Sequence, residues 1–553
     1  MKNIFKHLLL LMMLILAMGS CKKSFLEIEP VDRLTADNFF KNEGEIRAAT
    51  AALYGFPWFD YNDKFAWTAG DCMSGDVYHN WDQEGQFFYF SFNSGNAHLS
   101  SGWKGLFRVV SYANSVINDM PRSAEGNVSQ EVIDKALGEA RFVRAMAYYL
   151  LSEYWGEVPI VENSTEIVVS NDFFLPKNTR SSVLEFIRRD LEFASQNLPT
   201  SDVPGRITQW AAKGLLAKVH LTIASDLSNP KSAENFDLAK QFAADVINNS
   251  GLSLLPNYAD IFKYENNNNE ESLFALQWME GAYALGNSRQ ANWARSSLIT
   301  GNTEAWGGYK SMTYDFVQQV DGGDRRQPAI YMSNGDHYPE LRKNDGGYTY
   351  HIVNRDPNDP NTVLENASAT LNNLKKYIIG SSDDTAGGVS TGQATRINQI
   401  LLRLADVYMV YAEAALGSQA SISDGTALQY FNAIRSRANL PSLSSVTFMD
   451  ILKERRIEFA LEGINWFDIK RYFYRDAAGA VSYINGMQRE TTYYRDSSPN
   501  AADENTIEGW IENPPANPIT INESNMWLPI PSAEVVANPM LGPNEPAVEY
   551  DFN

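Results

Sequence analysis

Cysteine is nearly absent from the sequence. The 553 residues hold only Cys21 and Cys72, and Cys21 directly follows an apolar N-terminal stretch. Without Cys21 the chain keeps a single thiol, which excludes an intramolecular disulfide. A large domain must then be stabilised by its core, and 44% of the residues are hydrophobic. We expect Cys72 to be a small buried residue of that core.

Basic charge is also scarce. The chain holds 46 Lys and Arg residues against 67 Asp and Glu residues, which gives a formal net charge of −21. Proteins that bind nucleic acid or anionic lipid electrostatically need basic patches. The composition therefore argues against those two partner classes and favours neutral or cationic ligands.

Sequence motifs of catalytic and metal sites are missing as well. None of the six histidines stands in a metal-ligand spacing such as HExxH, and no P-loop, GxSxG or helix-opening GxGxxG occurs. The many carboxylates leave a surface glycosidase open as an enzymatic alternative. Segment 356–361 (DPNDPN) lacks the EF-hand order, so we expect solvated turns there, with a bound calcium ion as the open alternative. We predict a protein that is not an enzyme and has no cofactor or metal site.

The sequence has a single long apolar run, at residues 8–18. Lys2 and Lys6 accompany it, and small residues follow it, as in a secretory signal. The run is too short to cross about 30 Å of hydrocarbon, which needs roughly 20 apolar residues. Small residues before Cys21 resemble the bacterial lipobox, in which the cysteine is acylated. We therefore predict a signal peptide at 1–20 and a lipid anchor on Cys21, with several acyl chains for stable attachment.

Helical patterns dominate what remains. Apolar residues recur at helical spacing in several segments, namely 139–155, 208–224, 236–249, 398–416, 426–438 and 449–472. Thr208 is the expected N-cap of the second of these helices. The Ala-rich pairs around 208–249 and 398–438 are typical of helical hairpins that stack as in tetratricopeptide repeats. The fold class that we predict is mainly α, with a tetratricopeptide-like scaffold, long loop-rich insertions and minor β.

The middle of the chain differs in composition. Residues 266–395 are rich in Gly, Asn, Asp, Ser and aromatic residues, and the tail at 500–553 is Pro-rich. Long irregular stretches of this kind usually carry function. We predict four parts: the signal peptide, a helical part at 21–265 with an early binding loop near 71–100, the loop-rich binding region at 266–395, and a helical part with a closing tail at 396–553.

Four tryptophans lie in loop-like surroundings. A flat indole offers an apolar platform at low entropic cost, on which the C–H face of a sugar ring stacks. We expect Trp81 and Trp306 to be exposed and to act as platforms, together with Trp293, whereas Trp278 follows an apolar strand-like stretch and is equally consistent with the core. Side chains nearby that would orient sugar hydroxyls are Asn80, Asp82, Arg289, Asn292 and Tyr309. The tryptophans within helical stripes are expected in the core, namely Trp103, Trp155, Trp210 and Trp466.

Eight segments stand out in order along the chain: CKKSFLEIEP (21–30), ARFVRAMAYYLLSEYWGEVPIV (140–161), TQWAAKGLLAKVHL (208–221), ESLFALQW (271–278), RLADVYMVYAEAAL (403–416), FNAIRSRANLP (431–441), KERRIEFALEGINWFDIKRY (453–472) and MWLPIPSAEVVANPML (526–541). Together these collinear segments resemble the SusD/RagB family of Bacteroidetes lipoproteins.

The resemblance implies a surface lipoprotein of the outer membrane that faces the cell exterior. It would capture a glycan and deliver it to a SusC-like TonB-dependent transporter. It implies binding residues at Trp81 with its neighbours and in the range 278–309, and ion pairs rather than a binding site in KERRIEFALEG. Several tryptophans suit an extended β-linked plant glycan such as xyloglucan. A scaffold that binds peptide or protein stays open as the alternative.

Overall fold

The structure is a computed structural model that describes residues 39–391, 393–422 and 424–552, with the side chain of Tyr309 excepted. The predicted signal peptide and Cys21 lie outside these ranges. Long helices form the first half of the chain: α2 (Glu43–Ala51), α4 (Ala97–Ala124), α5 (Gln130–Trp155), α7 (Arg180–Asn197), α8 (Gln209–Ala224) and α9 (Ser232–Asn249). Two short ones accompany them, α3 (Asp82–Phe88) and α6 (Ser164–Ser170).

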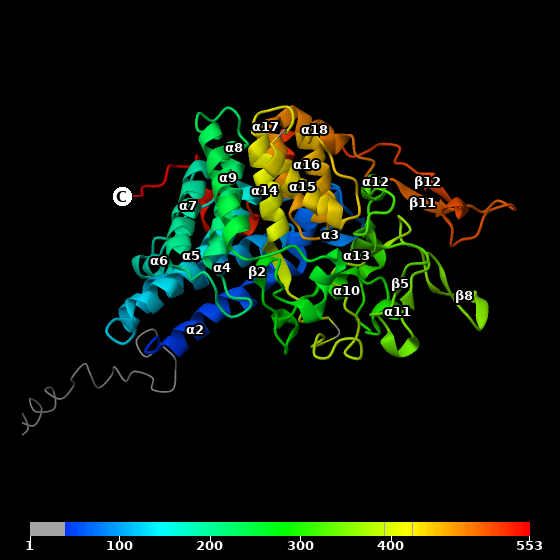
Figure 1. The fold of residues 1–553 in the computed structure, drawn as a ribbon, viewed down its shortest axis with the longest axis horizontal. Coiled ribbons are helices and arrows are strands. Elements are labelled where there is room, and N and C mark those ends of the chain that lie inside the picture. Colours follow the sequence, from blue (N-terminus) through cyan, green and yellow to red (C-terminus); the bar gives the residue numbers. More distant parts are fainter. Residues whose placement is uncertain (1–38, 392, 423, 553) are drawn as a thin grey trace, which may run out of the picture.

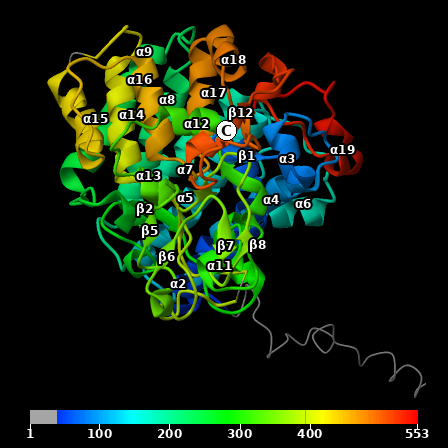
Figure 2. The same ribbon diagram turned by 90° about the vertical axis from the view of Figure 1, so that its right-hand side faces the viewer.

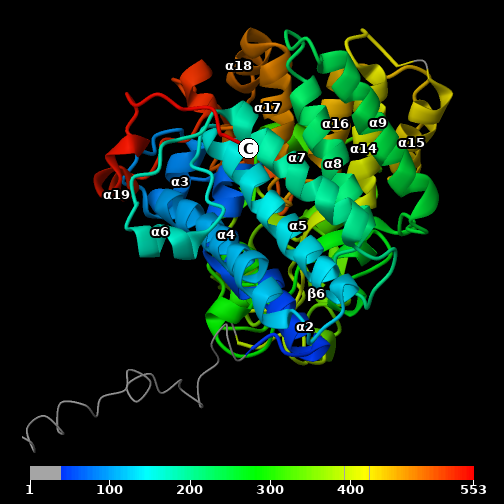
Figure 3. The same cartoon turned by 90° about the vertical axis from the view of Figure 1, so that its left-hand side faces the viewer.

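The helical stack continues into the second half. It contains α14 (Leu404–Leu416), α15 (Gly425–Arg437), α16 (Phe448–Glu458), α17 (Asn465–Arg475), α18 (Ala477–Asn485) and α19 (Ser532–Ala537). Each long helix packs on the next: α4 on α5, α5 on α7, then α7 on α8, α8 on α9, α9 on α14 and α14 on α15 (Figures 1 and 3). Nearly every residue of α8 is buried, because helices cover it on both sides. The predicted mainly-α scaffold of stacked helices is confirmed.

The loop-rich region carries only short elements. Its helices are α10 (Arg289–Trp293), α11 (Ser297–Thr300), α12 (Tyr314–Gln319) and α13 (Gln327–Ile330). The described strands form antiparallel pairs: β1 (Val77–His79) with β3 (Lys310–Met312), β2 (Ser272–Leu276) with β10 (Gln399–Arg403), β4 (Tyr331–Met332) with β9 (Asn373–Leu374), β5 (His337–Tyr338) with β6 (Tyr348–Thr349), β7 (Asn354–Asp356) with β8 (Asp359–Glu365), and β11 (Thr492–Arg495) with β12 (Trp510–Asn513). Figure 2 shows β5 to β8 gathered on one side of the helical stack.

Two of the predicted helices are wrong in part. Residues 399–403 form β10 rather than the first turn of a helix, because they pair with β2. A short apolar run fits a buried strand as well as a helix, and the tertiary partner decides between them. The predicted helix at 449–472 is interrupted between α16 and α17, where Gly463 adopts φ 77°. Thr208 stands at the N-cap of α8, but its side chain does not cap the helix.

The segment KERRIEFALEG forms buried ion pairs, as predicted. Arg455 contacts Asp406 at 2.7 Å and Asp468 at 2.9 Å. Glu458 contacts Arg403 at 2.7 Å, and Glu462 contacts the same guanidinium at 2.8 Å. These groups are almost fully buried, so each charge depends on its partner. The segment is part of the scaffold.

The core also confirms the smaller predictions. The four tryptophans that lie within helical stripes are buried: Trp103, Trp155, Trp210 and Trp466. Cys72 is a buried free thiol. None of the helices in the described ranges has the length and apolarity needed to cross a bilayer.

Candidate functional site

Strand pairing brings two distant tryptophans to one face. In the β1–β3 ladder His79 lies opposite Lys310. Trp81 follows the end of β1, and Trp306 lies shortly before β3, so both indoles emerge at the same end of this ribbon. Trp81 is 62% exposed and Trp306 is 42% exposed. The predicted exposure of both side chains is confirmed.

Asp76 fixes the start of this ribbon. Its carboxylate accepts from Arg456 at 2.7 Å and from Asn465 at 2.9 Å, and its carbonyl accepts from the Thr313 backbone at 2.8 Å. Arg456 and Asn465 belong to α16 and α17. The helical scaffold therefore holds the two strands that carry the tryptophans.

A carboxylate surrounded by basic groups lies three residues after Trp81 in the chain and is connected to Trp306 through Lys64. Glu84, in α3, contacts Lys64 at 2.7 Å, His79 at 3.1 Å, Lys310 at 3.5 Å and His98 at 3.9 Å. Burial alone would raise the pKa of the Glu84 carboxyl. The hydrogen bond from His79 and the charges of Lys310 and Lys64 outweigh burial and hold that pKa well below its usual range. Glu84 is therefore an anion that fixes the two lysines.

Lys64 connects this charge cluster to Trp306. Its ammonium lies 6.0 Å from the centroid of the indole and donates to the Asn292 side chain at 2.5 Å. The Trp306 loop is bonded to α10, since the backbone N–H of Trp306 donates to Ala291 at 2.7 Å. A Cβ on Gly307 would lie 2.2 Å from the Trp293 carbonyl oxygen, so only glycine permits this approach. The backbone on either side of the Trp306 side chain is therefore held against α10.

Four of the predicted binding residues are buried instead. Trp293 is fully buried and packs on Tyr377 at 5.8 Å and under the Arg289 guanidinium at 5.2 Å. Arg289 and Asn292 are buried with it in α10, and Trp278 is 5% exposed. The prediction that Trp293 is an exposed platform and that Arg289 and Asn292 face a ligand is wrong. These polar side chains make contacts within the protein instead: Asn292 accepts a hydrogen bond from Lys64, and Arg289 stacks on Trp293.

The remaining predicted residues lie near Trp81. Asn80 and Asp82 are exposed and flank it directly. The backbone of Tyr309 ends a short 3₁₀ helix (Gly307–Tyr309) beside β3, whereas its side chain lies outside the described part of the structure. Trp81, Trp306, Asn80 and Asp82 are hereafter called the tryptophan face.

Sequence reasoning missed Tyr283. Its ring lies edge-on to Phe59 at 5.2 Å, and its hydroxyl donates to Asp63 at 2.7 Å. Asp63 and Lys64 are neighbours on a π-helix, η4 (Tyr61–Phe65), so Tyr283 and Trp306 are held by consecutive residues. π-helical turns often occur at functional sites. The ring of Tyr283 is half-buried, and no local pattern in the sequence indicates its partner Asp63.

The described residues contain no group of three or more His, Cys, Asp or Glu side chains placed to hold a metal ion. In segment 356–361, Asp356 and Asp359 accept from backbone N–H groups two residues further on, as in Asx turns.

Comparisons with known proteins match almost the whole chain. Residues 236–546 match the model of the SusD family, and residues 42–221 match a model described as starch-binding associating with outer membrane. A SusD-like protein of Bacteroides ovatus is 36% identical over 554 residues, 97% of each chain.

Solved structures agree with the sequence matches. A crystal structure described as a complex with xylogluco-oligosaccharide shares 36% identity at a TM-score of 0.81 and covers 92% of this chain and 99% of that one. A laminarin-binding SusD-like protein, 22% identical at a TM-score of 0.65, shares the fold over 90% of this chain and 98% of its own. The chain belongs to the SusD/RagB family.

Proposed function

We propose that this protein is a non-catalytic glycan-binding protein of the cell surface, and that the tryptophan face is its binding site. The observation that carries the proposal is the register of β1 and β3, which brings the exposed Trp81 and Trp306 to the same end of one ribbon, with Lys64 of the Glu84 cluster 6.0 Å from the Trp306 ring. Exposed indoles stack on the apolar faces of sugar rings. Asn80 and Asp82 supply donors and acceptors for hydroxyl groups.

The ligand that we propose is an extended β-linked plant glycan such as xyloglucan. Flat, exposed indoles suit a flat chain, and a relative that is 36% identical over almost its full length was crystallised with a xylogluco-oligosaccharide. Each aromatic contact contributes only about 1 kcal/mol beyond the area that it buries. We expect a Kd between about 1 μM and 1 mM for one oligosaccharide.

The anchor and the partner complete the proposal. Acyl chains on Cys21 attach the protein to the outer membrane, facing the exterior, and a SusC-like TonB-dependent transporter receives the glycan. The description of the family model that matches residues 42–221 supports an association with the outer membrane. Binding of the glycan to the lipid-anchored protein would raise the effective concentration of the glycan at the transporter.

Isothermal titration with xyloglucan oligosaccharides tests the binding site. We expect Trp81→Ala and Trp306→Ala each to weaken binding by about tenfold or more, or about 1.4 kcal/mol. Phe174→Ala is the matched control, since Phe174 is an equally exposed aromatic residue outside the tryptophan face. Unchanged affinity in both tryptophan variants, or binding to a peptide panel instead, would refute the assignment. New reducing ends on prolonged incubation would show an enzyme.

A further inference from the structure

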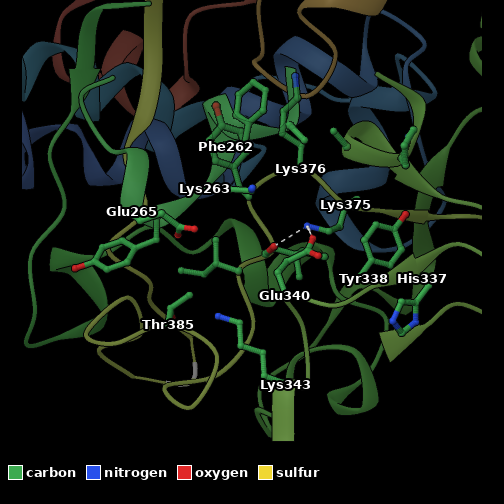
Figure 4. A pocket seen from close by; sticks show the side chains of 17 residues that line it. Phe262, Lys263, Glu265, His337, Tyr338, Glu340, Lys343, Lys375, Lys376 and Thr385 are labelled. Carbon is green, nitrogen blue, oxygen red and sulfur yellow. Dashed lines mark hydrogen bonds and ion pairs between the residues drawn. The ribbon is translucent and has the colours of Figure 1, made fainter. Parts of the chain in front are cut away.

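A separate cavity of about 210 Å³ lies in the loop-rich region (Figure 4). Its walls come from three places: the 3₁₀ turns η6 (Tyr258–Phe262) and η7 (Tyr264–Asn266), the segment around α13 and β5, and residues 375–379. Among the described residues, the side chains that line it are all different from those of the tryptophan face.

The cavity combines charges of both signs. Lys375 is almost buried and pairs with Glu340 at 3.2 Å, while its ammonium also donates to the Ile378 carbonyl at 3.1 Å. Lys263 pairs with Asp260 at 2.7 Å, and Lys343 donates to the Asp384 carbonyl. In Figure 4 the charged ends of Lys343, Lys375 and Glu340 face the hollow. These groups offer both donors and acceptors within one small space.

Lys376 also borders the cavity, but its charge is used elsewhere. Its ammonium donates to the Tyr258 hydroxyl at 2.7 Å and contacts Glu462 at 3.1 Å. The remaining lining charges are three lysines, Lys263, Lys343 and Lys375, against the carboxylates of Glu265 and Glu340. A free anion would meet Glu340 beside Lys375, so the near balance of charge favours a neutral ligand with many hydrogen-bonding groups.

Rings and aliphatic side chains form the rest of the wall, with Phe262, Tyr264 and Tyr338 among Pro328, Ile378 and Ile379. A hydroxyl-rich ring with apolar C–H faces matches such a lining. The volume falls below the roughly 300–1,000 Å³ of pockets for drug-sized ligands. A space of this size suits one ring better than a chain of rings.

We propose that this cavity binds a single neutral pyranose unit, as a second sugar site beside the tryptophan face. Glu340 accepts from the sugar hydroxyls, Lys343 and Lys375 donate to them, and the ring packs against Tyr264. The two sites are connected through α10. The Gln290 side chain of this helix accepts from the backbone N–H groups of Ile379 and Gly380 at 2.8 and 2.9 Å. The cavity does not depend on the proposed function of the tryptophan face.

Saturation-transfer NMR with methyl glucoside and methyl xyloside tests the proposal. We expect saturable signals with a millimolar Kd, and we expect them to persist in a Trp81→Ala/Trp306→Ala double variant. Lys343→Ala combined with Glu340→Gln should weaken these signals at least about fivefold, because both side chains make charge-assisted hydrogen bonds to the sugar. Lys104→Ala, a change at an exposed lysine elsewhere, is the control.

Three results would overturn the proposal. The first is the absence of a saturable signal up to about 50 mM methyl glycoside, which excludes the expected millimolar Kd. The second is loss of the signal in the tryptophan double variant, and the third is a stronger response to glucuronate or phosphate than to the neutral glycosides. The two proposals fail separately. If xyloglucan oligosaccharides do not bind the wild type while methyl glycosides bind the cavity, only the proposed function of the tryptophan face fails.

Discussion

Glu84 is the single residue on which the charges near Trp306 depend. Its side chain is 10% exposed and contacts Lys64 and Lys310 together with two histidines. Removing a partner from a buried ion pair costs more than the pair contributes, because the remaining charges keep their desolvation cost. Loss of the carboxylate would therefore disturb the positions of both lysines.

We expect Glu84→Gln to lower the free energy of unfolding by about 3 kcal/mol at pH 7, as measured by urea titration. The pKa of Glu84 is lower in the folded state than its ordinary value of 4.5, so its contribution is present above that value and is lost as the pH falls through the folded pKa. The difference between wild type and variant should shrink in acid. Glu508→Gln, at an exposed site, should leave the free energy of unfolding unchanged. An equal loss of stability in that variant would contradict the role of the Glu84 ion pairs.

Asp71 should show the opposite pH dependence. Burial raises its pKa from 3.8 to about 7, with Arg289 opposing the shift. The folded state then holds the proton more tightly than the unfolded chain, so stability falls as the pH rises from about 4 to 7. Relative to Asp71→Asn, the wild type should lose up to about 4 kcal/mol over this range. Parallel pH profiles of unfolding for the two proteins would contradict the prediction.

Residue-level reasoning succeeded where the flanking residues decided exposure and failed where the tertiary partners decided it. Trp306 is followed by two glycines, and this glycine-containing sequence predicts the exposure that the side chain shows. Trp293 has equally polar neighbours, yet Gln290 and Asn292 direct their side chains to partners in distant segments. The sequence around Trp293 does not predict those partners, because they lie far away in the chain.

At the scale of elements, two π-helices precede β1 and position residues beside the tryptophan face. η4 carries Asp63 and Lys64, and η5 (Thr68–Cys72) follows after two residues and is connected to β1 by a short turn. Gly70 of η5 lies against the backbone of the turn between α16 and α17, where an added Cβ would lie 2.5 Å from the Gly463 oxygen. The helical scaffold therefore touches this segment backbone to backbone.

We expect Gly70→Ala to destabilise the protein by about 2 kcal/mol or more, because the overlap involves backbone that cannot move aside easily. The variant should also weaken glycan binding, since η4 and β1 move with η5. Gly322→Ala is the control, as a Cβ there would meet open space. Thermal unfolding and titration calorimetry measure the two effects; equal stability of the two variants would refute this packing argument.

The sequence predicts α8 and α9 to within a few residues, because apolar stripes run along both helices. The stripe at 139–155 covers only the C-terminal part of α5, and the long helices α4 and α7 are not predicted. β10 was missed because its partner β2 lies far away in the chain, and the six strand pairs are too short to show alternation. The same distance between partners hid the approach of Tyr283 to Asp63.

For the whole molecule, Arg403 is the point where separate parts of the chain meet. The guanidinium contacts Glu271 at 2.7 Å, Glu458 at 2.7 Å and Glu462 at 2.8 Å, and all four groups are buried. Glu271 precedes β2, whereas Glu458 ends α16. Four charges thus join the loop-rich region to the C-terminal helices.

We expect Arg403→Leu to lower the free energy of unfolding by about 4 kcal/mol, because three buried carboxylates lose their common partner. Hydrogen exchange should accelerate in both halves of the chain. Arg189→Leu removes an exposed pair with Glu185 and should cost less than about 1 kcal/mol. Faster exchange confined to α16 would contradict the joining role.

The pairing of β1 with β3 also has a consequence for biogenesis. Val77 lies opposite Met312, so the ribosome must complete more than half of the chain before the two halves of the tryptophan face can meet. Contacts between such distant residues form late and slowly in folding. The nascent protein carries Trp81 before Trp306 has been synthesised. On the proposed function, binding at the tryptophan face therefore begins only when this long-range pairing is complete.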